Sequence, residues 1–319
     1  MPRGNTILVK NSFYYLISAT LPAAVNILLI PIYLNYISMA EFGAFNILFV
    51  LATFSSMLMS GQLHASVLRF FSLYKDDELK SYLFTLLACL FVIGLIAMSI
   101  LFWASPYIRS FFDLTVISVF TLNLAFVMAF VNVLKATLEA ITRSRQTGRD
   151  ILTKTVLFLT LQLTLVCGLI YLGQINVRNL MLTFIISELS GIIYLYLRNK
   201  NCFKLSFKIE LLRAPFNYSM GLAPHVFMKN ILRYVDRLLL VKLASLVDVG
   251  IYAILYKVAT LVERVVVAFG KAFTPYFMDE KEGRRHIDTA QISEFMTYYL
   301  LGMVLGIALV SRFIVGYLS

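Results

Sequence analysis

Residues 218–245 read YSMGLAPHVFMKNILRYVDRLLLVKLAS, an apolar stretch of membrane-spanning length that carries charges in its middle and second half. At about 100° per residue, Lys229, Arg233 and Arg237 follow one another along one face of a helix, and Asp236 lies between them. A lone Arg or Lys at the centre of a bilayer costs about 2.5 to 3.5 kcal/mol on insertion scales. This charged face therefore predicts a water-filled cavity or a charged partner, and with it a polar path through a membrane.

The whole chain has the composition of a membrane protein. Of its 319 residues, 60% are hydrophobic and 14% are charged, and the mean hydropathy is +0.82. Apolar stretches of about 20 residues predict about nine membrane helices with short connections between them. The predicted helices are 12–37, 43–65, 82–106, 114–135, 152–173, 179–198, 216–243, 248–273 and 293–315. We therefore expect an all-α fold, a polytopic transmembrane helix bundle that itself holds the activity.

Several kinds of site are absent from the sequence. Cys89, Cys167 and Cys202 are isolated, so their spacing predicts neither a disulfide framework nor a metal site. The chain has no GxxxxGK[ST] phosphate loop, no HExxH, no CxxC and no GxSxG. Its net charge of +11 alternates from connection to connection, which is typical of membrane topology. We therefore expect no bound cofactor, no metal, no nucleic-acid partner and no ATP hydrolysis within this chain.

Basic residues predict the orientation of the bundle. Most of the 28 Lys and Arg residues lie in every second connection. The rich segments are the residues before the first helix, 66–80, 135–154, 198–213 and 271–291. The positive-inside rule places these segments, and the N-terminus, in the cytoplasm. Anchoring to anionic lipid is the simplest role of these clusters.

The chain matches itself at an offset of about 207 residues. The aligned residues are Ser38, Glu41, Gly43 and Phe45 with Ser245, Asp248, Gly250 and Tyr252. Such internal repeats are typical of transporter folds. The repeat predicts two lobes: an N-terminal six-helix lobe at 1–200, a cytoplasmic linker at 201–214 and an incomplete C-terminal lobe of three helices at 215–319. By the same offset Ser319 corresponds to Phe112, so a symmetric C-terminal lobe would need three helices more.

Segments from both halves resemble one family of transporters. The segments are AEFGAFNI (40–47), GQLHASVLRFF (61–71), ITRSRQTGRD (141–150), YVDRLLLVKLASLVDVGIYAILYKVA (234–259) and KAFTPYFMDE (271–280). In order and spacing they resemble Wzx-type O-antigen and polysaccharide flippases of the multidrug/oligosaccharidyl-lipid/polysaccharide exporter superfamily. The resemblance implies a bacterial inner-membrane protein with a cytoplasmic N-terminus. It also implies transport, by alternating access, of an undecaprenyl-pyrophosphate-linked O-antigen or polysaccharide repeat unit to the periplasmic leaflet. Membrane lipids are its other expected partners, with polysaccharide polymerase and chain-length machinery as further candidates.

An anionic pyrophosphate needs fixed cations along its path through a membrane. Lys229 and Arg233, near the middle of their predicted helix, are the first candidates for contact with it. Arg69, at the end of the second predicted helix, and Lys257, in the eighth, are weaker candidates for the cavity.

Four further charges are predicted to act in gating or in structure. They are Asp236, Arg237, Glu263 and Glu188. Arg237 is expected to pair with Asp236 or to extend toward the membrane interface. Glu263 is expected to pair with a cation of the seventh predicted helix or to bind a coupling ion, Na+ or H+. For Glu188 the alternatives are an ionisable relay and a buried, hydrogen-bonded carboxyl.

Three other functions stay open on the sequence alone. A drug or metabolite exporter of the same superfamily would favour carboxylates over cations in its cavity. A membrane polysaccharide polymerase or ligase would be an enzyme with a large external loop, whereas the external connections here are short. A truncated flippase that no longer transports is the third alternative. We expect a transporter rather than an enzyme.

Overall fold

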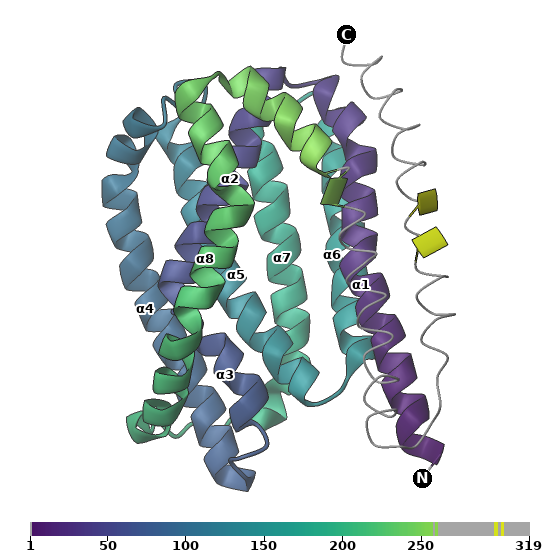
Figure 1. The fold of residues 1–319 in the computed structure, drawn as a ribbon, viewed down its shortest axis with the longest axis vertical. Helices are drawn as coiled ribbons and strands as arrows, with labels where there is room; N and C mark the ends of the chain where they lie inside the picture. The colour runs from purple at the N-terminus through teal and green to yellow at the C-terminus, as the bar shows by residue number, and fades with distance from the viewer. Residues whose placement is uncertain (1, 258, 261–296, 299–300, 303–319) are drawn as a thin grey trace. The chain divides into compact units, whose positions relative to one another are not determined.

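The computed structural model describes residues 2–257, 259–260, 297–298 and 301–302 (Figure 1). This part of the chain consists of helices and connections and contains no strand. The helices are α1 (Pro2–Leu34), α2 (Met39–Ser60), α3 (Leu63–Phe70), α4 (Asp76–Phe111), α5 (Val119–Ser144), α6 (Gly148–Tyr171), α7 (Val177–Asn199), the short 3₁₀ helices η1 (Lys200–Cys202) and η2 (Ile209–Leu212), and α8 (Arg213–Leu243). A further helix occupies 246–257. The predicted all-α helix bundle is confirmed.

Six helices in the described residues are long and apolar enough to cross a membrane. They are Phe13–Leu34, Met39–Ser60, Asp76–Phe111, Val119–Ser144, Gly148–Tyr171 and Val177–Cys202. They correspond to the first six predicted membrane helices. The seventh corresponds to α8, a continuous helix of 31 residues whose charges keep it out of that apolar set. The predictions for 248–273 and 293–315 lie largely outside the described residues.

The helices extend beyond the apolar stretches that predicted them. Residues 136–151 were predicted to connect the helices 114–135 and 152–173, but α5 continues to Ser144 and α6 begins at Gly148. Lys135 and Lys154, which were predicted at the ends of these two helices, therefore lie further inside them. Hydropathy marks the part of a helix that faces lipid or an apolar core. It does not mark turns whose charges are neutralised by partners on neighbouring helices.

The second predicted helix, 43–65, is broken in the structure. Helix α2 ends at Ser60, and Gly61 and Gln62 adopt left-handed conformations with φ of 49° and 59° before α3 begins. Glycine accepts this conformation without steric cost, whereas it is uncommon for glutamine. The break redirects the short helix α3, which packs against both α5 and α8.

The chain divides into two compact units, residues 31–253 and residues 1–30 with 254–319, and each is considered by itself. The site and the surfaces below all lie in the first unit. The predicted division into lobes at 1–200 and 215–319 remains a prediction. We call the end of unit 31–253 that holds the connections 71–75, 145–147 and 199–212 the basic end, and the other end the opposite end.

Helix α5 forms the centre of unit 31–253. It packs against α2, α3, α4, α6 and α7, and residues such as Leu122, Ala125 and Ala129 are fully buried. An aromatic cluster joins the neighbouring helices. The ring centroid of Phe184 on α7 lies 5.0 Å from that of Phe49 on α2 and 6.2 Å from that of Phe158 on α6. These contacts hold the helices around α5 in one body.

Matching helix starts meet at the opposite end. Ser38 and Glu41 form a capping box at the start of α2, in which the Ser38 backbone N–H donates to Glu41 Oε2 at 2.8 Å. Ser245 and Asp248 form the same arrangement before helix 246–257, with the Ser245 N–H 3.0 Å from Asp248 Oδ2. These are the residues on which the predicted repeat rests. The two motifs have the same local structure.

Candidate functional site

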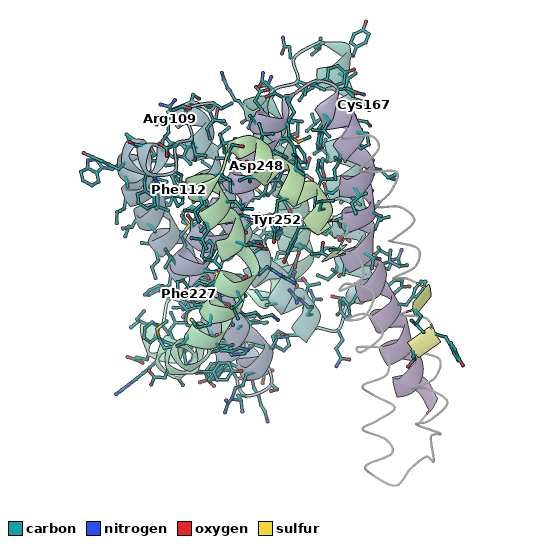
Figure 2. All side chains as sticks on the ribbon, turned by 45° about the horizontal axis from the view of Figure 1, so that its top comes forward. Arg109, Phe112, Cys167, Phe227, Asp248 and Tyr252 are labelled. Carbon is teal, nitrogen blue, oxygen red and sulfur yellow. The ribbon has the colours of Figure 1, made fainter. Side chains whose placement is uncertain are left out.

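Helix α8 lies along α2 and α3 through aromatic contacts (Figure 1). The ring centroid of Phe54 on α2 lies 6.4 Å from that of Phe227 and 6.2 Å from that of Tyr234, both on α8. Figure 2 labels Phe227 on α8, with Asp248 and Tyr252 on the helix that follows. The side of α8 with Phe227 and Tyr234 is therefore the side that packs on α2.

The charged face of α8 points away from this contact. At about 100° per residue, Lys229 and Asp236 fall on the side of α8 opposite to Phe227 and Tyr234, and Arg233 lies between that side and the aromatic contact, about 100° around the helix from Tyr234. The Lys229 side chain is exposed, and Arg233 and Asp236 are half-buried. Two cations near the middle of a 31-residue helix thus lie outside the apolar contact with α2. A face of this kind suits an anion that travels beside α8.

Asp236 and Arg237 are held within the protein. The Asp236 Oδ2 accepts a hydrogen bond from the Tyr252 hydroxyl, and Oδ1 accepts one from the backbone N–H of Arg237 at 2.8 Å. Arg237 is only 8% exposed, and its guanidinium carbon lies 5.4 Å from the ring centroid of Tyr234. Because this side chain is buried against an aromatic ring, the prediction that it extends outward as an interfacial anchor is wrong. The structural role predicted for Asp236 agrees with its bond to Tyr252, which ties α8 to the next helix.

Arg69 lies on the surface that α3 presents to α8. Its guanidinium carbon is 4.8 Å from the ring centroid of Tyr218, and the Phe70 ring centroid lies 6.2 Å from the same ring. The side chain of Arg69 is exposed at the basic end. Arg69 is therefore near the beginning of α8, whereas Lys229 and Arg233 are near its middle.

Two predicted residues cannot be placed beside α8. Lys257 is half-buried in helix 246–257 and belongs to the second compact unit. Glu263 lies outside the described residues. Their predicted roles in the cavity and in ion coupling remain predictions.

Glu188 on α7 lies at the centre of a buried ion network. Its Oε1 is 2.7 Å from Lys135 Nζ on α5, and its Oε2 is 2.9 Å from Lys154 Nζ on α6. Lys154 also lies 3.5 Å from Glu139 Oε1, and Glu139 Oε2 lies 3.2 Å from Arg143. The side chains of Lys154 and Glu188 are 7% and 9% exposed, and that of Lys135 is 22% exposed. Of the two alternatives for Glu188, the structure shows the buried, hydrogen-bonded carboxylate.

The packing around Lys154 directs its ammonium group to Glu188. A Cβ atom at Gly191 on α7 would lie only 2.7 Å from Lys154 Cε and 3.0 Å from its Cγ. Glycine at this position thus leaves room for the lysine stem. The ammonium group also lies 5.4 Å from the ring centroid of Phe158, one turn further along α6.

His64 on α3 lies near Glu139 and Arg143 of the network. Burial, together with the positive charge of Arg143, lowers the pKa of His64 to about 4, although the negative charge of Glu139 partly opposes this. The imidazole is therefore neutral at physiological pH. Helix α3 thus places the neutral His64 near the network and the cation Arg69 beside Tyr218 of α8.

Sequence reasoning found Glu188 but missed its partners. Lys135, Glu139 and Arg143 stand four residues apart on one face of α5, and this spacing was available in the sequence. It was overlooked because the residues were counted as part of a basic connection. No sequence signal showed that Lys154 and Glu188 would meet, since this contact depends on how α6 packs on α7.

The structure thus contains two separate groups of charged side chains on its helices. The network joins α5, α6 and α7, whereas the charged face belongs to α8, which packs chiefly on α2 and α3. Glu188 is therefore not brought together with Lys229 and Arg233. Among the described residues, no group of three or more His, Cys, Asp or Glu side chains is arranged to hold a metal ion.

Comparison with known families decides the class of protein. The family model described as polysaccharide biosynthesis protein matches residues 8–280. The chain belongs to this family. No curated protein and no solved structure matches it. The family covers Wzx-type flippases and related polysaccharide exporters, and membership with a bundle of apolar helices indicates a multi-pass membrane protein of polysaccharide biosynthesis.

Proposed function

We propose that this member of the polysaccharide biosynthesis family is a Wzx-type flippase. It would move an undecaprenyl-pyrophosphate-linked repeat unit from the cytoplasmic to the periplasmic leaflet of the bacterial inner membrane. The observation that supports this most directly is the position of Lys229 and Arg233 near the middle of α8, outside the side of the helix on which Phe227 and Tyr234 contact α2. The family match supports a polysaccharide precursor as the substrate. The two cations support a binding site for the anionic pyrophosphate of its lipid carrier.

The chemistry of the carrier explains why cations are needed at this depth. A pyrophosphate loses its hydration on entering a membrane, and fixed donors must replace the lost water contacts. Arg233 offers two parallel N–H donors to phosphate oxygens, while Lys229 acts as a compact positive charge. Within the proposal, the substrate's glycan and pyrophosphate travel along the charged face of α8, and the lipid tail stays in the bilayer.

Charge reversal on α8 tests the proposal. We expect Lys229→Glu and Arg233→Glu each to lower transport of the lipid-linked saccharide by roughly 10- to 100-fold, because a charge-assisted hydrogen bond contributes about 1.5 to 3 kcal/mol. The measurement is restoration of surface polysaccharide in a strain that lacks its flippase, with the amount of each variant in the membrane determined by immunoblot.

The matched control is Arg149→Glu, which reverses an exposed cation in the first turn of α6 at the basic end. This variant should restore surface polysaccharide as the unaltered chain does. Normal polysaccharide from both α8 variants, present at normal amounts, would refute the role of Lys229 and Arg233 as phosphate contacts.

The proposed direction of transport requires the basic end to face the cytoplasm. We expect reporter domains fused after Arg145 or Lys204 to read cytoplasmic and one fused after Asn176 to read periplasmic, as the positive-inside rule predicts. Paired phosphatase and fluorescent-protein fusions at each position measure this. The reverse pattern would contradict the proposed orientation.

A further inference from the structure

The connection between α7 and α8 contains a segment in which apolar and polar residues alternate. Residues 203–209 read FKLSFKI, with Phe203, Leu205, Phe207 and Ile209 apolar and the three residues between them polar. The backbone is extended at Phe203 and Lys208, with φ of −112° and −135°, it bends at Leu205, and Ile209 begins η2.

This segment is bound to the first three turns of α4. The Lys204 Nζ lies 2.6 Å from Asp77 Oδ2, and the Lys208 N–H donates to the Thr85 hydroxyl at 3.0 Å. The backbone N–H of Lys204 also donates to the Lys80 carbonyl at 3.4 Å. These bonds run along the length of the segment and hold it against α4.

The apolar side chains of the segment point outward. Leu205 is 91% exposed, Phe207 59% and Ile209 58%. Phe203 stacks on Tyr196 of α7, with ring centroids 5.9 Å apart and an interplanar angle of 21°. Tyr196 is itself 48% exposed, so five large side chains form one outward-facing strip, which we call the linker strip.

The surroundings of the linker strip match the boundary of an anionic bilayer. Helix α4, to which the segment is bound, continues into an apolar span whose large side chains are exposed, among them Ile96, Ile100 and Trp103. Cations flank the strip. They are Lys80, Lys200, Lys204, Lys208 and Arg213. Exposed apolar side chains beside lysines, next to a lipid-facing helix, are typical of segments that lie in the headgroup region.

We propose that the linker strip is a membrane-interface anchor. Leu205, Phe207 and Ile209 insert among the headgroups and upper acyl chains, and the flanking cations contact anionic phospholipid. The connection between α7 and α8 is thereby held flat against the bilayer at the basic end. This inference does not depend on which substrate the protein carries.

Quenching of tryptophan fluorescence tests the anchor. The chain has a single tryptophan, Trp103, so Trp103→Phe gives a background in which one new tryptophan can be observed. Leu205→Trp and Phe207→Trp are introduced separately, and the full chain is placed in nanodiscs of phosphatidylcholine and phosphatidylglycerol. Phosphatidylcholine brominated in the upper part of its acyl chains is the quencher. We expect roughly twofold or greater quenching at both positions, because interfacial side chains lie within about 5 to 10 Å of that depth.

The matched control is Glu78→Trp in the same background. Glu78 is exposed in the first turn of α4 at the same end and is not one of the apolar side chains of the strip. Weak quenching at this position with strong quenching at the other two supports the anchor. Equal quenching at all three positions, or none at Leu205→Trp and Phe207→Trp, would overturn it. Absence of quenching at Leu205→Trp and Phe207→Trp would instead indicate that the linker strip is a surface for a protein partner.

Discussion

Replacing Glu188 with glutamine is expected to lower the free energy of unfolding by about 3 to 5 kcal/mol, the cost of removing one partner from a buried ion pair. The carboxylate of Glu188 lies within 2.9 Å of both Lys135 and Lys154, and the Lys154 side chain is only 7% exposed. Without its charge, two ammonium groups remain together among three helices. The burial of Lys154 limits its solvation, so the loss of the carboxylate is only partly offset by the more distant Glu139, 3.5 Å away.

Thermal unfolding of the purified protein in detergent measures this loss, for example as the fraction that stays monodisperse after heating. The control is Glu210→Gln, which neutralises an exposed carboxylate in η2. We expect it to change stability by no more than about 0.5 kcal/mol. A Glu188→Gln variant as stable as this control would show that the network is not formed in the membrane protein.

A second substitution separates the charge effect from a packing effect. Lys135→Met removes one of the two cations that Glu188 neutralises. Lys154 then keeps Glu139, whose Oε1 lies 3.5 Å away, as its partner. We expect the double variant Glu188→Gln/Lys135→Met to recover about half of the stability that Glu188→Gln loses. In a double-mutant cycle, the destabilisation of the double variant would then be smaller than the sum of the two single losses. Additive losses would mean that Glu188 stabilises the bundle by its shape and not by its charge.

The network also shows where sequence reasoning was sufficient and where it was not. Apolar stretches located six membrane-spanning helices, because burial in lipid requires a continuous run of apolar residues. Ser38 with Glu41 and Ser245 with Asp248 were found as aligned members of a repeat, and the structure adds that each pair forms a capping box within one turn. The meeting of Lys154 and Glu188 is not local, and it depends on the packing of α6 on α7.

The charged face of α8 illustrates the same limit. Helical periodicity placed Lys229, Arg233 and Asp236 on one side, and the structure adds that Lys229 and Asp236 are opposite to the contact with Phe54 while Arg233 lies beside it. The sequence could not show which side of α8 would pack on α2 and which on α3, since both of these helices have apolar and aromatic side chains. It also gave no sign of the break at Gly61, which lies within an apolar stretch.

Replacing Gly43 with alanine is expected to lower the free energy of unfolding by about 1 to 3 kcal/mol, as overpacking does in a closely packed core. A Cβ atom at Gly43 in α2 would lie 1.9 Å from the Leu246 carbonyl oxygen and 3.0 Å from the backbone nitrogen of Gly250. In the opposite direction, a Cβ at Gly250 would lie 2.6 Å from the Met39 carbonyl oxygen. The obstructing atoms are backbone atoms of a helix start, so no side-chain rotation relieves the clash.

The destabilisation expected for Gly43→Ala is opposite in sign to the usual effect of this substitution in a helix. Alanine in place of glycine normally stabilises a helix by about 0.5 to 1 kcal/mol. Gly168 in α6 and Gly221 in α8 have no atom within 4 Å of an added Cβ, so Gly168→Ala and Gly221→Ala are the matched controls and should be neutral or stabilising. Thermal unfolding in detergent compares the three variants. A Gly43→Ala variant as stable as these controls would mean that the starts of α2 and helix 246–257 are not in backbone contact. A loss of stability in Gly43→Ala alone would support this contact.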